Sequence, residues 1–516
     1  MKTSFHTCCP AHGQNHTSEN LISRRKFIKV AGGTTLSVAT LSGLSWSVLA
    51  STGMKEHSGL IRQALVVKPI LVYSAPEYRH QTSWRSWGGI QTDEDAGEEV
   101  LRIKGELDKL RSSADFPVDF LPVAAIKGPD DIDGIPDLDA ADTFLVYAAG
   151  GWMDTFDALH QRKKDMIFFC RHKSGPVYLW YEIISPRFLR QHTDKLAVSG
   201  VDEEDVVIDN QDELLWRLRA LCGLKNTRNK TIIAVGGAGA WSQPEGVVQG
   251  LVKDKFKLRI KTLPYDELGR IITEVKKDDA AVSRARQRAA EYLDDSSLTL
   301  ETDRTYVDNC FLLEEVFRKI MDRVNCRAIT INGCMGTIMP MAETSACMTL
   351  SLLNDAGYLA FCESDFVVIP AGILLANISG KPVFMNDPTY PHDGIITLAH
   401  CTAPRLMNGT TQEPARILTH FESDYGAAPK VEMRKGQVVT NIIPDFRVSQ
   451  YAGLKGTIID HPFMDICRSQ IDVGFDIDSN LLARRMSGFH WMTGYGDYLK
   501  ETGYALKRLG IEWEQI

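Results

Sequence analysis

The stretch from Met339 to Pro404 constrains the fold more than any other part of this chain of 516 residues. It is apolar enough to form part of a core, yet acidic residues interrupt it and histidines lie near its end. These polar residues are Glu343, Glu363, Asp365, Asp387, His392 and His400. A buried carboxylate is costly unless it is paired, hydrogen-bonded or bound to a metal. The stretch therefore predicts a functional site inside a core.

The local pattern of this stretch predicts a helix followed by a strand. We expect the helix to begin near Pro340, with Glu343 in its first turn, where the helix dipole favours a carboxylate. A short apolar strand should end at Cys362, followed directly by Glu363 and Asp365. In open α/β sheets, ligands bind outside the carboxyl ends of the strands. These two acids are therefore expected at a binding edge.

The rest of the chain predicts an α/β protein with a β-rich end. Short strands alternate with helices from Lys68 onward, which favours a parallel sheet, and the strand Thr231–Val235 opens a second such unit. After Lys381 the pattern changes to short β segments separated by Gly, Pro and Asn turns. We expect two Rossmann-like parallel α/β domains and then a β-rich, barrel-like C-terminal domain. The expected domains span residues 66–225, 226–375 and 376–516.

The first 50 residues have the features of an export signal. Ser23–Lys29 contains a twin-arginine pattern, Val30–Ala50 is a weakly apolar run, and small residues precede Ser51 as in a cleavage site. We therefore predict a twin-arginine signal peptide over residues 1–50 and a periplasmic or extracytoplasmic location. An uncleaved anchor or a chance arginine pair is the alternative. No stable membrane span is expected after cleavage.

Charge and cysteine content exclude several classes of protein. The net charge of −8 argues against nucleic acid or an anionic membrane as the main partner. Nine cysteines lie beyond the predicted leader, an odd number without a C-x-x-C pair. This pattern favours buried free thiols over a disulfide framework or a zinc cluster.

One region resembles a known family. M-x-E at 341–343, L-L-N at 352–354, E-x-D at 363–365, G-K-P-V-F at 380–384 and D-x-T-Y at 387–390 resemble the metal-site region of L-fucose isomerase. The segment FMNDPTY is similar to a related segment of L-arabinose isomerase, and G-F-H at 488–490 is similar to a late histidine motif of that enzyme.

The resemblance implies a ligand set and a chemistry. In these sugar isomerases two carboxylates and a late histidine bind a divalent metal, which implies Glu343, Asp365 and His490 as ligands of Mn²⁺ or Mg²⁺. The same resemblance implies Glu343 and Asp365 as the catalytic acids of proton transfer through an enediolate. Glu363 competes with Asp365, because arabinose isomerases emphasise the first acid of the motif. Without the resemblance, these residues also suit a helix start, a helix N-cap and a core histidine.

Substrate and partners are also implied. Trp84, Arg85 and Trp87 lie in an aromatic and basic loop that suits a sugar pocket, with ordinary loop packing as the alternative. His392 and His400 are further substrate-binding candidates, with an ordinary turn histidine and an ordinary strand-end histidine as the alternatives. The resemblance implies a small sugar as substrate and a homo-oligomer, a trimer or hexamer.

The function expected from the sequence is therefore a metal-dependent aldose–ketose isomerase. A non-catalytic sugar-binding or sensing protein of the same fold is one alternative. A metal-dependent hydrolase or lyase on polyhydroxylated substrates is another.

Overall fold

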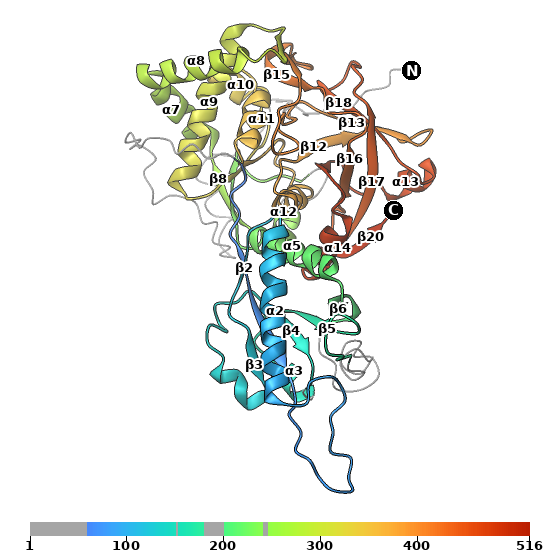
Figure 1. Ribbon diagram of the computed structural model, residues 1–516. Helices are drawn as coiled ribbons and strands as arrows, with labels where there is room; N and C mark the ends of the chain where they lie inside the picture. The colour runs from blue at the N-terminus through green and yellow to red at the C-terminus, as the bar shows by residue number, and fades with distance from the viewer. Residues whose placement is uncertain (1–58, 151–152, 180–200, 241–245) are drawn as a thin grey trace, which may run out of the picture. The chain divides into compact units, whose positions relative to one another are not determined.

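The computed structural model describes residues 59–150, 153–179, 201–240 and 246–516, and these divide into two compact units (Figure 1). The N-terminal unit comprises residues 62–226 and 500–508. The C-terminal unit comprises the described residues 59–61, 227–499 and 509–516. The predicted signal peptide lies outside the described residues.

The N-terminal unit is built on a parallel sheet in the order β2-β1-β4-β5-β6, with β3 also paired to β1. The central strands are almost entirely buried, in keeping with their Val, Ile and Phe content. The strands are β1 (Leu65–Val72), β2 (Val118–Phe120), β3 (Ala124–Ile126), β4 (Thr143–Ala148), β5 (Asp165–Cys170) and β6 (Val206–Ile208). The helices are α2 (Asp93–Ser113), α3 (Met153–His160), α5 (Gln211–Thr227) and, from the end of the chain, α14 (Leu499–Lys507).

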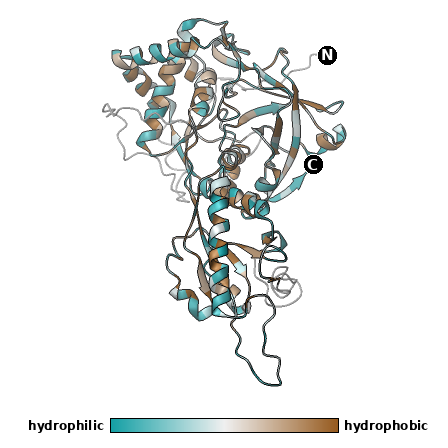
Figure 2. Cartoon of the chain, in the orientation of Figure 1, coloured by the Kyte–Doolittle hydropathy of each residue, from teal (hydrophilic) through white to brown (hydrophobic). Residues whose placement is uncertain are grey.

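Helix α2 shows how the sequence sets an element of this unit. Thr92 and Asp95 form a capping box at its start, which satisfies backbone N–H groups that the helix itself leaves without partners. Ile103, Leu107 and Leu110 form its buried stripe, whereas its visible face is largely hydrophilic (Figure 2). Glu99 is also buried on this helix, and this charge needs a partner.

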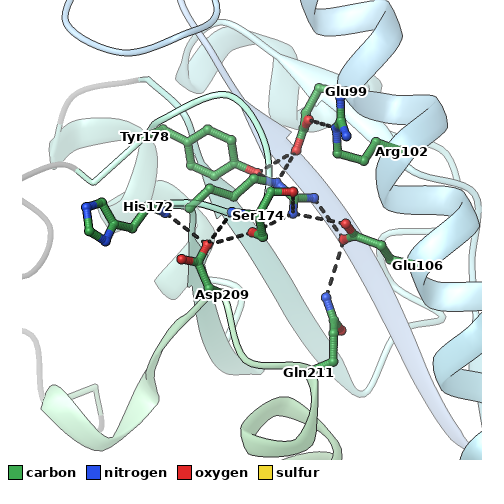
Figure 3. A network of polar contacts seen from close by, with 9 residues as sticks. Glu99, Arg102, Glu106, His172, Ser174, Tyr178, Asp209 and Gln211 are labelled. Carbon is green, nitrogen blue, oxygen red and sulfur yellow. Dashed lines mark hydrogen bonds and ion pairs between the residues drawn. The ribbon is translucent and has the colours of Figure 1, made fainter.

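That partner is Arg171, at the end of β5. Its guanidinium contacts Glu99 at 2.6 Å, Glu106 at 2.8 Å and the Tyr178 hydroxyl at 2.8 Å. Figure 3 shows Glu99, Glu106 and Tyr178 grouped around Ser174 in one network of polar contacts. Arg102 also contacts Glu99, at 3.1 Å. We refer to this set as the Arg171 network: Arg171, Arg102, Glu99, Glu106, Tyr178 and Ser174.

The C-terminal unit contains a second parallel sheet, in the order β11-β10-β7-β8. Its strands are β7 (Thr231–Val235), β8 (Arg259–Leu263), β10 (Ala328–Ile331) and β11 (Leu359–Phe361). Helices α7, α8 and α9 group together beside it (Figure 1). The helices of this region are α6 (Val247–Phe256), α7 (Tyr265–Lys276), α8 (Asp279–Leu293), α9 (Arg304–Arg323), α10 (Ile338–Ala342), α11 (Cys347–Asp355) and α12 (Ile369–Ser379). Two predicted sheets of parallel strands are thus present.

The helix expected around Glu343 differs from the prediction. The chain forms the short helix α10, and Glu343 follows it with a left-handed φ of 55° before α11 begins. Glu343 therefore ends a helix instead of lying in a first turn, because a right-handed helix cannot continue through a residue with a left-handed backbone.

The C-terminal region forms a closed antiparallel barrel, as the β-rich pattern predicted. Six strands pair in the ring β16-β19-β12-β13-β18-β17, and β17 pairs with β16 to close it (Figure 1). They are β12 (Phe384–Pro388), β13 (Ile395–His400), β16 (Val438–Ile443), β17 (Gln450–Asp460), β18 (Ser469–Gly474) and β19 (Trp491–Tyr495). Large buried side chains such as Trp491 and Leu454 fill its interior.

Smaller elements complete the C-terminal unit. The strands β9 (Leu298–Leu300), β14 (Ala415–His420) and β15 (Tyr425–Val431) form a separate sheet. The strand β20 (Glu512–Gln515) runs parallel to β17, and the helix α13 (Ser479–Arg485) precedes β19. The barrel and the second parallel sheet belong to one compact unit, so a domain boundary near residue 375 stays a prediction.

Two sequence expectations can be checked directly. All nine cysteines among the described residues are buried and outside any disulfide, as predicted. Within the same residues, no helix is both long and apolar enough to cross a bilayer.

Candidate metal centre

Strand register brings acids and histidines together at one end of the barrel. Asp387 on β12 pairs with Ala399 on β13, which places His400 one residue further along. On its other side β12 pairs with β19, where Asn386 lies opposite Trp491. His490 directly precedes that strand and therefore lies beside Asp387.

The second parallel sheet supplies two more carboxylates. Glu363 and Asp365 follow β11 at its carboxyl end, where the sequence predicted a binding edge. Glu363 and Ser364 both have left-handed backbones, with φ of 60° and 47°. Two successive non-glycine residues in this conformation cost on the order of 1–3 kcal/mol each and are typical of functional sites. The loop after β7 holds the segment in place through a hydrogen bond of 3.0 Å from the Gly239 N–H to the Ser364 carbonyl.

These residues form one buried set, which we call the acid–histidine cluster: Glu363, Asp365, Asp387, His400 and His490. The His490 Nε2 lies 3.3 Å from a carboxylate oxygen of Glu363 and 3.2 Å from one of Asp387. The His400 Nε2 lies 3.6 Å from the other Glu363 oxygen. The His490 and Asp365 side chains are fully buried, and that of Asp387 is 15% exposed. The cluster is therefore largely withdrawn from water.

Asp365 orients His490. Its Oδ2 lies 2.7 Å from the Nδ1 of His490, which assigns a proton to Nδ1 and directs Nε2 toward the other two acids. The Asp365 Oδ1 accepts a hydrogen bond from the Val367 N–H at 3.0 Å. Metal-binding histidines are commonly held by a carboxylate in this way. Asp365 is thus placed as a support for a ligand, and Glu363 as the acid that faces the centre.

His400 is held similarly, by a polar contact on its other ring nitrogen. Its Nδ1 lies 2.9 Å from the Thr402 hydroxyl, so its Nε2 is the atom turned toward Glu363. Both histidines therefore present Nε2 to the same group of carboxylates.

Electrostatics favour positive charge in this cluster. Burial alone would lower the pKa of His400, but the Glu363 and Asp387 carboxylates raise it to about 9. Burial is likewise outweighed at His490, whose pKa is raised well above its usual value by Asp387, Asp365 and Glu363. The pKa of Glu363 is held below its usual range despite burial, because the two histidines stabilise its charged form. The surroundings therefore stabilise a cation among the carboxylates.

The donor set fits a divalent ion. Carboxylate oxygens with imidazole nitrogens suit Mn²⁺ or Mg²⁺ when the oxygens dominate, and also zinc or iron. Asp387, His400 and His490 each offer one ligand atom, and these three atoms lie within 4.8 Å of one another. Glu363 completes the set through the contacts above.

The predicted site residues divide into those that join this cluster and those that do not. Asp365 and His490 are in contact, and Glu363 and His400 belong to the same cluster. Glu343 does not belong to it: its side chain is 65% exposed and its carboxylate lies 2.8 Å from the Lys276 ammonium. His392 is also exposed and pairs with Asp393.

The predicted sugar-binding loop lies in the other unit. Tyr78 and Trp84 pack edge to face, Arg85 lies over the Trp84 ring, and Trp87 is 73% exposed. These contacts account for Trp84 and Arg85 by local packing, and a role of this loop in sugar binding stays a prediction.

Asp387 is the residue to which the sequence assigned no role. Its presence in the D-x-T-Y motif was a signal, but its partners follow only from barrel register. Neither models of protein families nor curated protein sequences match this chain.

Proposed function

We propose that this chain is a divalent-metal-dependent aldose–ketose isomerase whose metal ligands are Glu363, Asp387, His400 and His490. The observation that carries the proposal is the convergence of these side chains, from the ends of β11, β12 and β13 and the start of β19, into one buried set. Such a set is costly to bury without a cation.

The architecture is consistent with this proposal. We assign the two parallel sheets to the two Rossmann-like domains expected from the sequence, and the six-stranded ring to the third, barrel-like domain. The cluster lies where the carboxyl end of β11 meets the barrel.

The chemistry divides among the residues by position. A bound divalent ion would polarise the carbonyl of an open-chain aldose and stabilise the developing enediolate. The Asp387 carboxylate is the more exposed of the two acids facing the centre and is assigned to take the C2 proton and deliver it to C1. The Glu363 carboxylate moves the hydroxyl proton between O1 and O2. Asp365 keeps the Nε2 of His490 turned toward the centre.

Metal binding and turnover test the proposal together. Wild-type protein should bind one Mn²⁺ per chain and convert members of an aldose panel to ketoses, in a reaction that EDTA stops and Mn²⁺ restores. His490→Ala should weaken Mn²⁺ binding by at least about 100-fold, because even the supports of ligands contribute 10- to 100-fold. Glu343→Gln is the matched control and should bind Mn²⁺ like the wild type, since its carboxylate pairs with Lys276.

The outcomes separate the alternatives. Mn²⁺ binding that depends on His490 without turnover of any aldose would overturn the isomerase and favour a sugar-binding protein. Loss of Mn²⁺ binding in Glu343→Gln but not in His490→Ala would overturn the assigned centre itself.

A further inference from the structure

A small cavity lined by sulfur adjoins the acid–histidine cluster within the C-terminal unit. The centre of a water-sized sphere can move within about 10 Å³ of this cavity. That is about the space needed by one water or one ion. Five of the nine described cysteines line it, and two methionines add thioether sulfur. These cysteines are Cys334, Cys347, Cys362, Cys401 and Cys467.

Three of these thiols form a connected row. Cys401 directly follows β13 and Cys467 lies just before β18, and the two strands pair with His400 opposite Ser469. Cys347 begins α11 and packs in the same buried cluster as Cys401. The thiols of Cys347 and Cys467 both line the cavity together with that of Cys401. Three distant segments thus deliver sulfur to one place.

The surroundings of the row suit a soft ligand. Cys347, Cys401 and Cys467 pack in one buried cluster with Ala399 and Ala428. Small apolar side chains surround the three sulfur atoms in this cluster, while His400, His420 and Glu363 line other parts of the same cavity. Thiolates and thioethers select ions such as Cu(I), whereas carboxylates select Mg²⁺ and Mn²⁺.

The cavity also shares a wall with the acid–histidine cluster. Cys362, Glu363 and His400 each offer one donor atom, and these three atoms lie within 4.8 Å of one another. Sulfur, carboxylate and imidazole donors therefore meet along this wall, and His420 adds a second imidazole to the lining of the cavity.

We propose that the sulfur-lined cavity is a second metal site, which takes one thiophilic d¹⁰ cation such as Cu(I) on Cys401 together with Cys347 and Cys467. Binding exchanges thiol protons for the cation, so that protons leave to solvent and no atom changes oxidation state. This proposal does not depend on whether the chain is an isomerase.

Competition for Cu(I) tests the site directly. The full chain, reduced and kept anaerobic, is titrated with Cu(I) against a chromophoric Cu(I) chelator. We expect one Cu(I) per chain and a loss of affinity of at least about 10-fold in Cys401→Ser, as for loss of a metal-site residue. Cys222→Ser is the control, since this buried thiol in the N-terminal unit hydrogen-bonds to the Gln63 and Pro117 carbonyls and a hydroxyl can do the same. It should leave Cu(I) affinity unchanged.

X-ray absorption and two further variants keep the test decisive. Sulfur neighbours around the bound copper would support the site, and a shell of nitrogen and oxygen alone would overturn it. If Cys401→Ser does not fold, Cys347→Ser and Cys467→Ser take its place, and each should weaken Cu(I) binding. Failure of the wild type to compete with the chelator, or equal affinity in all folded variants, would also overturn the proposal.

Discussion

The Arg171 network and the acid–histidine cluster are both buried and charged, but only the first balances its charges with its own residues. In the network the guanidinium groups of Arg171 and Arg102 face the carboxylates of Glu99 and Glu106. Arg171 donates from its Nε and both terminal nitrogens to acceptors at 2.6–3.0 Å. A set of this kind has the features of a structural support.

The cluster has the opposite balance. Three carboxylates, those of Glu363, Asp365 and Asp387, face only two imidazoles, so negative charge remains even when both histidines are protonated. The His490 Nε2 also faces two carboxylates at similar distances, although it carries at most one proton. The difference indicates that burial of charge alone does not mark a site, whereas a surplus of one sign does.

The largest effect on stability is expected from removing Arg171 from the Arg171 network. Arg171→Met should lower the free energy of unfolding by about 3–5 kcal/mol, because it leaves buried carboxylates without their cation. Arg102→Met, whose side chain is 46% exposed, should cost about 1 kcal/mol or less. Urea denaturation measures both. Equal losses in the two variants would contradict the view of Arg171 as the centre of the network.

A bound divalent metal should stabilise the acid–histidine cluster and, through it, the fold. At Mn²⁺ concentrations about 100-fold above the dissociation constant, wild-type protein should gain about 2.7 kcal/mol in unfolding free energy. Asp387→Asn should show little of this gain, whereas Glu343→Gln should retain it. Thermal unfolding with and without Mn²⁺, followed by chelation, measures the difference. A gain that persists in Asp387→Asn would place the ion elsewhere.

Asp365→Asn separates a support from a ligand. Because Asp365 orients His490 through a contact of 2.7 Å, the variant should weaken Mn²⁺ binding by about 10- to 100-fold, less than the loss of His490 itself. Calorimetric titration of the two variants gives the ranking. A larger loss in Asp365→Asn than in His490→Ala would make Asp365 a direct ligand, as the family resemblance implied.

The smallest expected effect is on the pH dependence of stability, through Asp209. Partial burial would raise the pKa of Asp209, but hydrogen bonds from Ser174 and from the backbone N–H groups of 172–174 hold it well below its usual value (Figure 3). A carboxylate with a depressed pKa stabilises the fold above the unfolded pKa of about 3.9, and this stabilisation is lost as pH falls below it. The urea midpoints of wild type and Asp209→Asn should therefore stay apart between pH 7 and about pH 5, and draw closer as pH falls below about 3.9. A constant gap would show that Asp209 does not act through its charge.

Local signals in the sequence predicted much of this molecule. The apolar strand before Glu363 and Asp365, the strand Thr231–Val235 and the β-rich pattern after Lys381 all correspond to observed elements. Such patterns succeed because they depend on side-chain alternation and turn residues within a few positions. The same reasoning failed at Glu343, where the chain makes a left-handed turn and its carbonyl accepts a hydrogen bond from the distant Asn309 side chain.

The sequence by itself determined which donors are available: an E-x-D pair after a buried strand, a late histidine, and cysteines scattered among apolar segments. Only the tertiary structure decided which of them meet. Asp387 and His400 lie on consecutive strands, whereas His490 lies far from both along the chain, and the three converge through the register of β12 with β13 and β19. Cys401 and Cys467 meet through the register of β13 with β18. Register is a property of paired strands, and a shift of one residue would turn these side chains to the opposite face. No single segment carries that information, because it arises only when the barrel closes.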